Sequence, residues 1–226
     1  MPTIRQFENE LGHIREQLLL MSSLTERNLS LAMKALIERD DNLASTVESE
    51  DSQIDQLEIA VDEMVITYMA THAPVARDCR FMLAASKISS NLERIGDQAT
   101  TIARRTKELN KEPLLKPLID IPMMADIAAD MLRDGITCFV EQDVDTAISI
   151  ISRDKSVDSI YKQLVRELTT YMIEDPKTIT RALHLMVIAK ALESAADHAA
   201  NIAEDIVYLY RAQDVRHDPA IKAGHA

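Results

Sequence analysis

The sequence predicts an all-α protein whose six long helices form two pseudo-symmetric three-helix bundles. Residues with good helix propensity dominate the 226-residue chain, which has only 4 glycines, 7 prolines and no tryptophan. Apolar residues recur at spacings of three and four, the period of one helix face. The pattern of the first half also returns in the second. Turn-rich β architectures need more glycine, aromatic and β-branched residues than this chain contains.

Three helices are expected in the first half, near residues 4–38, 42–71 and 75–109. Asp40 begins an acidic interruption that suits the capping of the second helix. Pro74 ends that helix, because proline disfavours the α conformation in the residue before it. The third helix has an apolar seam made of Phe81, Ala85, Ile88, Leu92, Ile95, Ala99 and Ile102.

Three more helices are expected near residues 122–141, 144–173 and 177–211, with breaks at Gln142-Asp143 and at Pro176. The domain boundaries follow: a first bundle at 1–111, a proline-containing linker at 112–121, a second bundle at 122–213 and a polar tail at 214–226. The sixth helix repeats the apolar seam with Leu185, Ile188, Leu192, Ala195, Ala199, Ile202, Ile206 and Leu209.

The two halves match in register, which indicates a duplicated unit. A shift of 103 residues places Asp51 on Asp154 and Asp55 on Asp158. A shift of 100 residues then places Leu83, Ile88, Leu92, Glu93, Asp97, Ala99, Ile102 and Ala103 on identical residues. Shared helical patterning explains apolar matches, but it does not explain acidic positions that recur in register.

The repeated acids are candidate metal ligands. Each half has an Asp-x-x-x-Asp helix followed by a Glu-x-x-x-Asp helix, and residues four apart lie on one helix face within about 6 Å at Cβ. In the first half we expect Glu93, Asp97 and Asp55 on the outer side and Asp51 on the flank. Antiparallel neighbouring helices would bring the four carboxylates together. The two candidate clusters are Asp51, Asp55, Glu93 and Asp97, and Asp154, Asp158, Glu193 and Asp197.

A metal ion would relieve the repulsion within such a cluster, which is about 4 kcal/mol for two charges about 4 Å apart at an effective dielectric near 20. Hard oxygen ligands favour Mg, Mn, Ca or iron over a thiolate-type zinc site. Two alternatives stay open at this point. The acids are a solvated outer face of a helical scaffold, or they belong to a carboxylate-metal enzyme.

The enzyme alternative has weak support in the sequence. A di-iron carboxylate bundle needs two Glu-x-x-His motifs that project into the core, and this chain has one, Glu10 to His13. His198 follows Asp197 and is an additional metal-ligand candidate, although a packing role suits it better. There is no nucleophile elbow, phosphate-binding glycine loop or dinucleotide fingerprint.

Composition indicates a cytoplasmic protein that does not bind nucleic acid. The net charge is −12, and no basic stripe stands out for contact with phosphate backbones. Cys79 and Cys138 lie within helical patterns without CxxC spacing, so we interpret them as structural thiols in a reducing compartment. No segment reaches the length of about 20 apolar residues that spans a bilayer.

Two segments resemble the signature of the PhoU family of bacterial phosphate-transport accessory and regulatory proteins. The first is Asn91-Leu92-Glu93-Arg94-Ile95-Gly96-Asp97, followed by Ala99, Ile102 and Ala103. The second runs from Asp197 to Glu204. The resemblance extends over nearly the whole chain, from Phe7 to about Arg211.

This resemblance implies that the eight acids bind divalent or trivalent metal ions (Mg, Mn, Fe or Zn) in multinuclear surface sites. It also implies a non-enzymatic, often dimeric negative regulator of phosphate uptake and of the phosphate-starvation response. Such a protein couples the phosphate ABC transporter to a sensor histidine kinase, and it is peripheral to the membrane through these partners. The second half has Ser194-Ala195-Ala196 in place of Arg94-Ile95-Gly96, so we expect the two clusters to differ in affinity or metal. The substitution Gly96→Leu tests where residue 96 lies. Leucine should be tolerated if the position is outside the core, and it should lower the melting temperature strongly if Gly96 permits a close helix contact.

Overall fold

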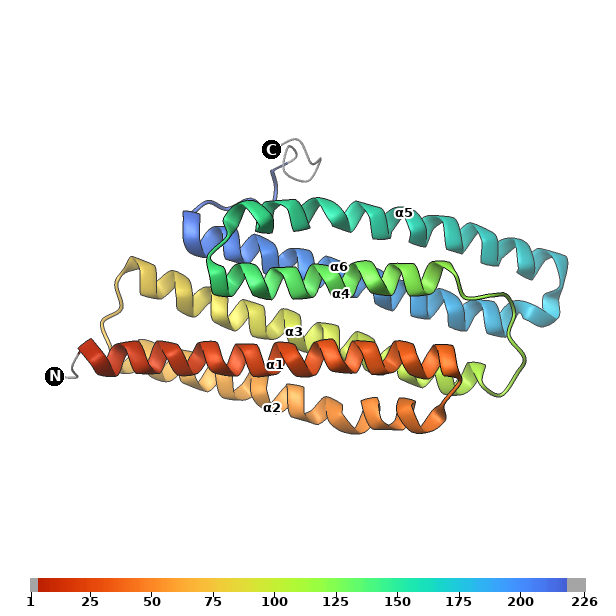
Figure 1. Cartoon of the computed structure of the whole chain (residues 1–226), viewed down its shortest axis with the longest axis horizontal. Helices are drawn as coiled ribbons and strands as arrows, with labels where there is room; N and C mark the ends of the chain where they lie inside the picture. Colours follow the sequence, from red (N-terminus) through yellow and green to blue (C-terminus); the bar gives the residue numbers. More distant parts are fainter. Residues whose placement is uncertain (1–3, 219–226) are drawn as a thin grey trace.

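The computed structural model describes residues 4–218, with side chains from residue 9 onward, and consists of long helices joined by short loops (Figure 1). Residues 1–3 and 219–226, which belong to the expected first bundle and polar tail, lie outside this range. The helices are α1 (Ile4–Glu38), α2 (Asp41–Thr71), α3 (Ala76–Leu109), α4 (Asp120–Glu141), α5 (Val144–Glu174) and α6 (Ile179–Arg211), with a short 3-10 helix η1 (Pro176–Thr178) before α6. The predicted all-α class is confirmed.

The helices form two three-helix units joined by α3 and α6, which pack side by side along the middle of the molecule (Figure 1). Helix α3 contacts α1, α2 and α6, whereas α6 contacts α3, α4 and α5. Every residue of the two predicted apolar seams is buried. The duplicated unit predicted from the sequence is therefore present in the fold.

The duplication extends to the backbone of the helix connections. Arg39 has φ 58° and Gln142 has φ 62°, and these left-handed residues are 103 positions apart. Each is followed by an aspartate that caps the next helix. Asp40 accepts hydrogen bonds from the backbone N–H groups of Asn42 and Leu43, and Asp143 accepts one from Thr146. Capping by aspartate explains why both chain reversals occur where the sequence predicted them.

Two helix starts differ from the prediction by two residues, and those of α2 and α3 differ by one. Helix α4 begins two residues earlier, at Asp120, because Pro122 falls within the first turn, where a missing backbone N–H costs little. The region before α6 first forms η1, in which Asp175 caps the N–H of Lys177. The linker is fixed in place by Lys116, whose buried ammonium group pairs with Asp120 and with a glutamate of α5.

Polar contacts across the α3–α6 interface join the two units. Lys87 Nζ lies 2.9 Å from Asp205 Oδ1, and the Asp205 side chain is only 8% exposed. His198 Nδ1 lies 2.9 Å from Asn91 Oδ1. Cys79 and Cys138 are both free thiols, as predicted. Among the helices described, none combines the length and the apolar character that a membrane span requires.

Candidate functional site

The first carboxylate cluster lies where α2 and α3 approach each other closely. Asp51 and Asp55 come from α2, and Glu93 and Asp97 come from α3. Gly96 is buried between the two pairs: a Cβ atom at this position would lie 3.0 Å from Ile54 Cδ1 and 3.7 Å from Asp51 Oδ1. The absent side chain thus allows the helices to approach, which places Asp51 beside the α3 backbone.

Electrostatic coupling shows that the four predicted acids share one surface. The pKa of Glu93 is raised from 4.5 to about 7, first by burial and then by the negative charges of Asp97 and Asp55, against the opposing effect of Arg94. Burial also raises the pKa of Asp51, together with the charges of Asp55 and Asp97. These carboxylates repel one another, and the nearby basic groups do not neutralise them completely.

The predicted orientation is correct for Asp97 and Asp55 on the outside and for Asp51 on the flank, and it is wrong for Glu93, which is more buried than predicted. The Asp97 side chain is 46% exposed, and Asp55 is exposed. Glu93 is only 17% exposed, and Asp51 is half-buried. The difference arises because α3 packs against three helices, so positions beside its apolar seam are covered as well. Position 96 is likewise inside the interface and not on the outer face.

One further acid belongs to this surface and was not predicted. Glu58 lies one turn after Asp55 on α2, and its charge adds to the rise in the pKa of Glu93. The comparison of the two halves did not identify Glu58, because the equivalent position in the second half is Tyr161 and not an acid. The three-residue spacing from Asp55 was the available signal.

Lysine side chains compensate the second cluster. Lys190 forms an ion pair with Glu193, and Lys162 Nζ lies 3.2 Å from Asp158 Oδ2. At the equivalent positions the first half has Ser90 and Ile59, which carry no charge.

The remaining acids of the second cluster are held on the same pair of helices. The Asn201 amide group lies 3.4 Å from Asp197 Oδ2, and Asp154 is half-buried on α5. The two clusters therefore share their acids but differ in how their charge is balanced.

The donor chemistry of both clusters suits hard metal ions, since the side chains supply carboxylate oxygens. Within the described part of the chain, however, no three His, Cys, Asp or Glu side chains form a group that could hold a metal ion as they stand. In the first cluster, Arg94 lies 3.5 Å from Glu93 and 3.7 Å from Asp97. Metal binding would require these side chains to turn toward one another, which the exposed Asp55 and Asp97 do more readily than the partly covered Asp51 and Glu93.

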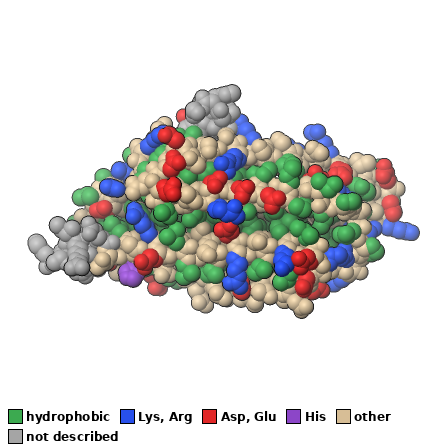
Figure 2. All heavy atoms as spheres, in the orientation of Figure 1, with side chains coloured by type: hydrophobic (Ala, Val, Ile, Leu, Met, Phe, Trp, Pro, Cys, Tyr) green, Lys and Arg blue, Asp and Glu red, His purple; other side chains and the backbone are tan. Residues whose placement is uncertain are grey.

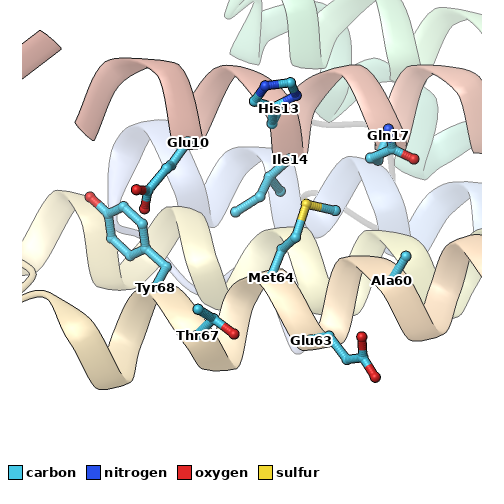
Figure 3. Close-up of a pocket in the computed structure, with 9 residues that line it drawn as sticks. All are labelled: Glu10, His13, Ile14, Gln17, Ala60, Glu63, Met64, Thr67 and Tyr68. Atoms are coloured by element: carbon cyan, nitrogen blue, oxygen red, sulfur yellow. The ribbon is translucent and has the colours of Figure 1, made fainter. Parts of the chain in front are cut away.

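The Glu-x-x-His motif does not build a second centre in the core. Glu10 and His13 line a groove of about 490 Å³ between α1 and α2, with Ile14 and Met64 between the helices (Figure 3). The Glu10 carboxylate points toward the ring of Tyr68, whereas His13 lies on the outer side of α1 (Figure 3). The side chain of His13 is 69% exposed, so the motif does not project into the bundle as a di-iron site requires.

His198 has the packing role that the sequence favoured. It forms its hydrogen bond with Asn91 across the α3–α6 interface, and burial lowers the pKa of its imidazole. The neutral ring thus links the two units.

The comparison with known proteins matches both units. The family model for the PhoU domain matches residues 18–106 and 121–206. The phosphate-specific transport system accessory protein PhoU homolog of Pseudomonas putida is 41% identical over 214 residues, which cover 94% of this chain and 84% of the relative. The accessory protein PhoU of Escherichia coli (strain K12) is 36% identical over 212 residues, which cover 94% and 88%.

Solved structures agree with these sequence matches. The crystal structure of PhoU from Pseudomonas aeruginosa has a TM-score of 0.90 and 38% identity, and the match covers 92% of this chain and all of that one. The phosphate transport system regulatory protein PhoU from Streptococcus pneumoniae has a TM-score of 0.86 and 28% identity, with coverage of 93% and 99%. On the two domain matches and these full-length similarities, the chain belongs to the PhoU family.

Proposed function

We propose that this protein is a non-enzymatic accessory protein of a phosphate transport system, in which it restrains phosphate uptake and phosphate-starvation signalling. The observation that carries the proposal is its similarity to proteins named as accessory proteins of phosphate-specific transport, over 94% of its length. In this role it couples the phosphate ABC transporter, through the ATPase subunit, to a sensor histidine kinase. It acts in the cytoplasm, on the side of the membrane where that subunit lies.

An exposed apolar stripe on α2 supports docking onto a protein partner. Ile59, Ile66 and Met69 are all exposed, and their spacings of seven and three place them on one helix face. The second half has Lys162, Thr169 and Met172 at the equivalent positions, so the stripe is particular to the first half. Ile66 and Met69 are neighbours on this face, and Asp62 and Glu63 lie between them and Ile59.

The two carboxylate clusters are proposed as metal sites of this regulator. Asp51, Asp55, Glu93 and Asp97 would hold metal in the first half, and Glu58 is close enough in charge coupling to assist. The second site would use Asp154, Asp158, Glu193 and Asp197. A bound metal ion would neutralise the repulsion between these groups and brace the helices of each unit against each other.

A genetic experiment tests the regulatory role. The gene is deleted in its own host, and phosphate uptake and a starvation-response reporter are measured in phosphate-rich medium. We expect both to rise in the deletion strain and to return to normal with the wild-type gene. Unchanged uptake and reporter activity would contradict the proposal.

A binding experiment tests the partners. The tagged protein is expected to co-purify the transporter ATPase subunit and the histidine kinase, and Ile66→Asp combined with Met69→Asp should weaken this. Ile173→Asp is the control, because Ile173 is an exposed apolar residue on α5. Equal capture by all three proteins would exclude the α2 stripe as the docking surface.

Metal content distinguishes the regulator from an acidic scaffold without metal. Metal is measured in protein purified without chelators, for wild type and for the Glu93→Ala/Asp97→Ala and Glu193→Ala/Asp197→Ala double variants. We expect each variant to lose the metal of one cluster and to keep its helical circular dichroism. Asp126→Ala/Asp130→Ala is the control, because this exposed pair on α4 has the same spacing. Absence of metal from every protein would support the scaffold alternative.

The enzyme alternative and the oligomeric state need separate measurements. Turnover on a substrate panel by metal-loaded protein, lost in Glu93→Ala, would favour a carboxylate-metal enzyme over a regulator. We also propose a homodimer, and light scattering coupled to size-exclusion chromatography should give twice the monomer mass of 25.3 kDa.

A further inference from the structure

A group of arginines surrounds a polar cavity at the end of the molecule where α3 begins and α6 ends, on the left in Figure 1. The cavity has a volume of about 580 Å³, and Arg77, Arg80 and Arg211 contribute to its lining. A neighbouring cavity of about 320 Å³ shares Arg77 and adds Arg15. Several basic side chains are visible toward this end of the molecule in Figure 2. Four arginines in one place contrast with a chain of net charge −12.

Three aspartates line the two cavities, and each already has a partner, whereas two of the arginines do not. Asp78 accepts a hydrogen bond from the backbone N–H of Val75. Asp145 Oδ1 lies 2.6 Å from Arg211, and Asp143 is occupied in capping α5. Within the residues that the structure describes, neither Arg77 nor Arg80 forms an ion pair or a side-chain hydrogen bond. The positive charge of these two groups is therefore available to a ligand.

Arg80 also has a buried donor without an acceptor. Its Nε atom is inaccessible to solvent and has no hydrogen-bond partner in the structure. An unsatisfied buried donor is unfavourable, and more so on a charged group. Arg80 also lines the cavity, so an anion there would offer acceptors to the remaining N–H groups of this guanidinium and a partner for its charge.

The surroundings hold the arginines in position. Tyr210 lines both cavities and donates a hydrogen bond of 2.8 Å to the carbonyl oxygen of Phe139. Arg15 stacks over the ring of Phe81, 5.2 Å from its centroid. Burial raises the pKa of Tyr210, and the charges of Arg15 and Arg77 oppose that rise, which places both guanidinium groups near its hydroxyl.

We propose that this arginine-lined cavity binds a small tetrahedral oxyanion of the phosphate class. The planar guanidinium fork matches two oxygens of such an anion, and several forks can surround it. The inference stands on these residues alone and does not depend on the proposed regulatory function.

Titration calorimetry with the full chain tests the proposal. Inorganic phosphate is titrated at constant pH and ionic strength, in the presence of a chelator so that the acidic clusters do not contribute. Wild type should bind saturably, and Arg77→Gln and Arg80→Gln should each weaken binding at least tenfold. Arg166→Gln, an exposed arginine of α5 outside the cavity, should bind like wild type. Arg80→Lys, which keeps the charge but not the fork, should fall between wild type and Arg80→Gln.

Two further probes identify the source of the anion. Phenyl phosphate represents a phosphoryl group carried on another molecule, and hexaglutamate represents an acidic peptide. Binding of inorganic phosphate alone supports a site for the free ion, and binding of phenyl phosphate as well supports one that also accepts phosphoryl groups. The proposal is overturned if neither phosphate compound binds, if Arg77→Gln and Arg80→Gln bind phosphate as wild type does while folded, or if only hexaglutamate binds.

Discussion

The α2–α3 interface and the equivalent α5–α6 interface differ in where one methyl group lies. This difference can be tested quantitatively. The first half combines Ile54 with Gly96, whereas the equivalent positions of the second half combine Val157 with Ala196. All four residues are buried. The larger partner in one helix thus accompanies the smaller one in the other, and Gly96→Ala with Ile54→Val would convert the first arrangement into the second.

Each single substitution should destabilise the protein or leave it nearly unchanged. The methyl group of Gly96→Ala would lie 3.0 Å from Ile54 Cδ1, and overpacking of this kind costs about 1–3 kcal/mol. The better helix propensity of alanine offsets about 1 kcal/mol of that loss. Ile54→Val removes a methylene group from a fully buried side chain, at a cost of about 0.5–1.5 kcal/mol.

The double variant should be more stable than the sum of the single effects predicts. With both changes there is neither a clash nor a cavity, so we expect its free energy of unfolding within about 1 kcal/mol of wild type. This corresponds to a stabilising coupling of about 1–3 kcal/mol. Gly96→Leu, in contrast, should destabilise the protein by more than Gly96→Ala, because the longer side chain has no space between the helices.

Urea unfolding followed by circular dichroism measures these differences, provided that the m-value stays constant across the series. The reverse exchange in the second half, Val157→Ile with Ala196→Gly, is the matched control and should show coupling of the same sign. Additive effects in the first half would refute the argument that Gly96 is needed for close helix packing. Unchanged stability of Gly96→Leu would refute it as well.

Three further predictions concern charged groups. In metal-free protein the pKa of Glu93 is raised from 4.5 to about 7, so the folded state holds this proton more tightly than the unfolded state and stability should fall as pH rises through that window. With its partial exposure the loss is about 2–3 kcal/mol, and urea midpoints at pH 5 and pH 8 should differ less in Glu93→Gln than in wild type. Lys87→Met leaves the Asp205 carboxylate buried without its ammonium partner. This variant should lower the free energy of unfolding by about 2–3 kcal/mol at pH 8 and by less at pH 4. No loss at pH 8 would show that this ion pair does not hold the units together. Lys190→Ser removes the ion pair of Glu193, which competes with metal for this carboxylate. Calorimetry should show metal binding at the second cluster about two- to fivefold tighter, since exposed ion pairs contribute up to about 1 kcal/mol. Weaker metal binding would show that Lys190 does not compete with the metal.

Helix positions and packing seams were predictable because local chemistry determines them. The aspartate caps at Asp40 and Asp143 and the break at Pro74 act within a few residues, and they placed the helix ends to within about two residues. The apolar seams of α3 and α6 follow from spacing alone. The burial of Gly96 did not follow, because it depends on how closely α2 approaches α3, and a heptad pattern does not contain that distance.

The carboxylate surface was predictable for a different reason. Identical spacing in two halves marked the acids as a set, and the fold places the α2 and α3 members on one surface. Glu58 escaped this comparison because the second half has an aromatic residue in its place. The arginines of the end cavity come from α1, α3 and α6, so only the folded chain brings them together.

The different charge balance of the two clusters has a consequence for the duplicated unit. In the first cluster, repulsion is relieved partly by protonation of Glu93 and by Arg94, a single basic group that Glu93 and Asp97 share. In the second cluster, Glu193 and Asp158 already have lysine partners. Near pH 7 we therefore expect the acids of the first half to be the less satisfied set, so that a cation would gain more by binding there. Sequence duplication supplied two copies of the acids, and the substitutions Ser90 to Lys190 and Ile59 to Lys162 made the copies unequal. If both clusters bind metal as proposed, they should fill one after the other, over a wider range of metal concentration than two equal sites would.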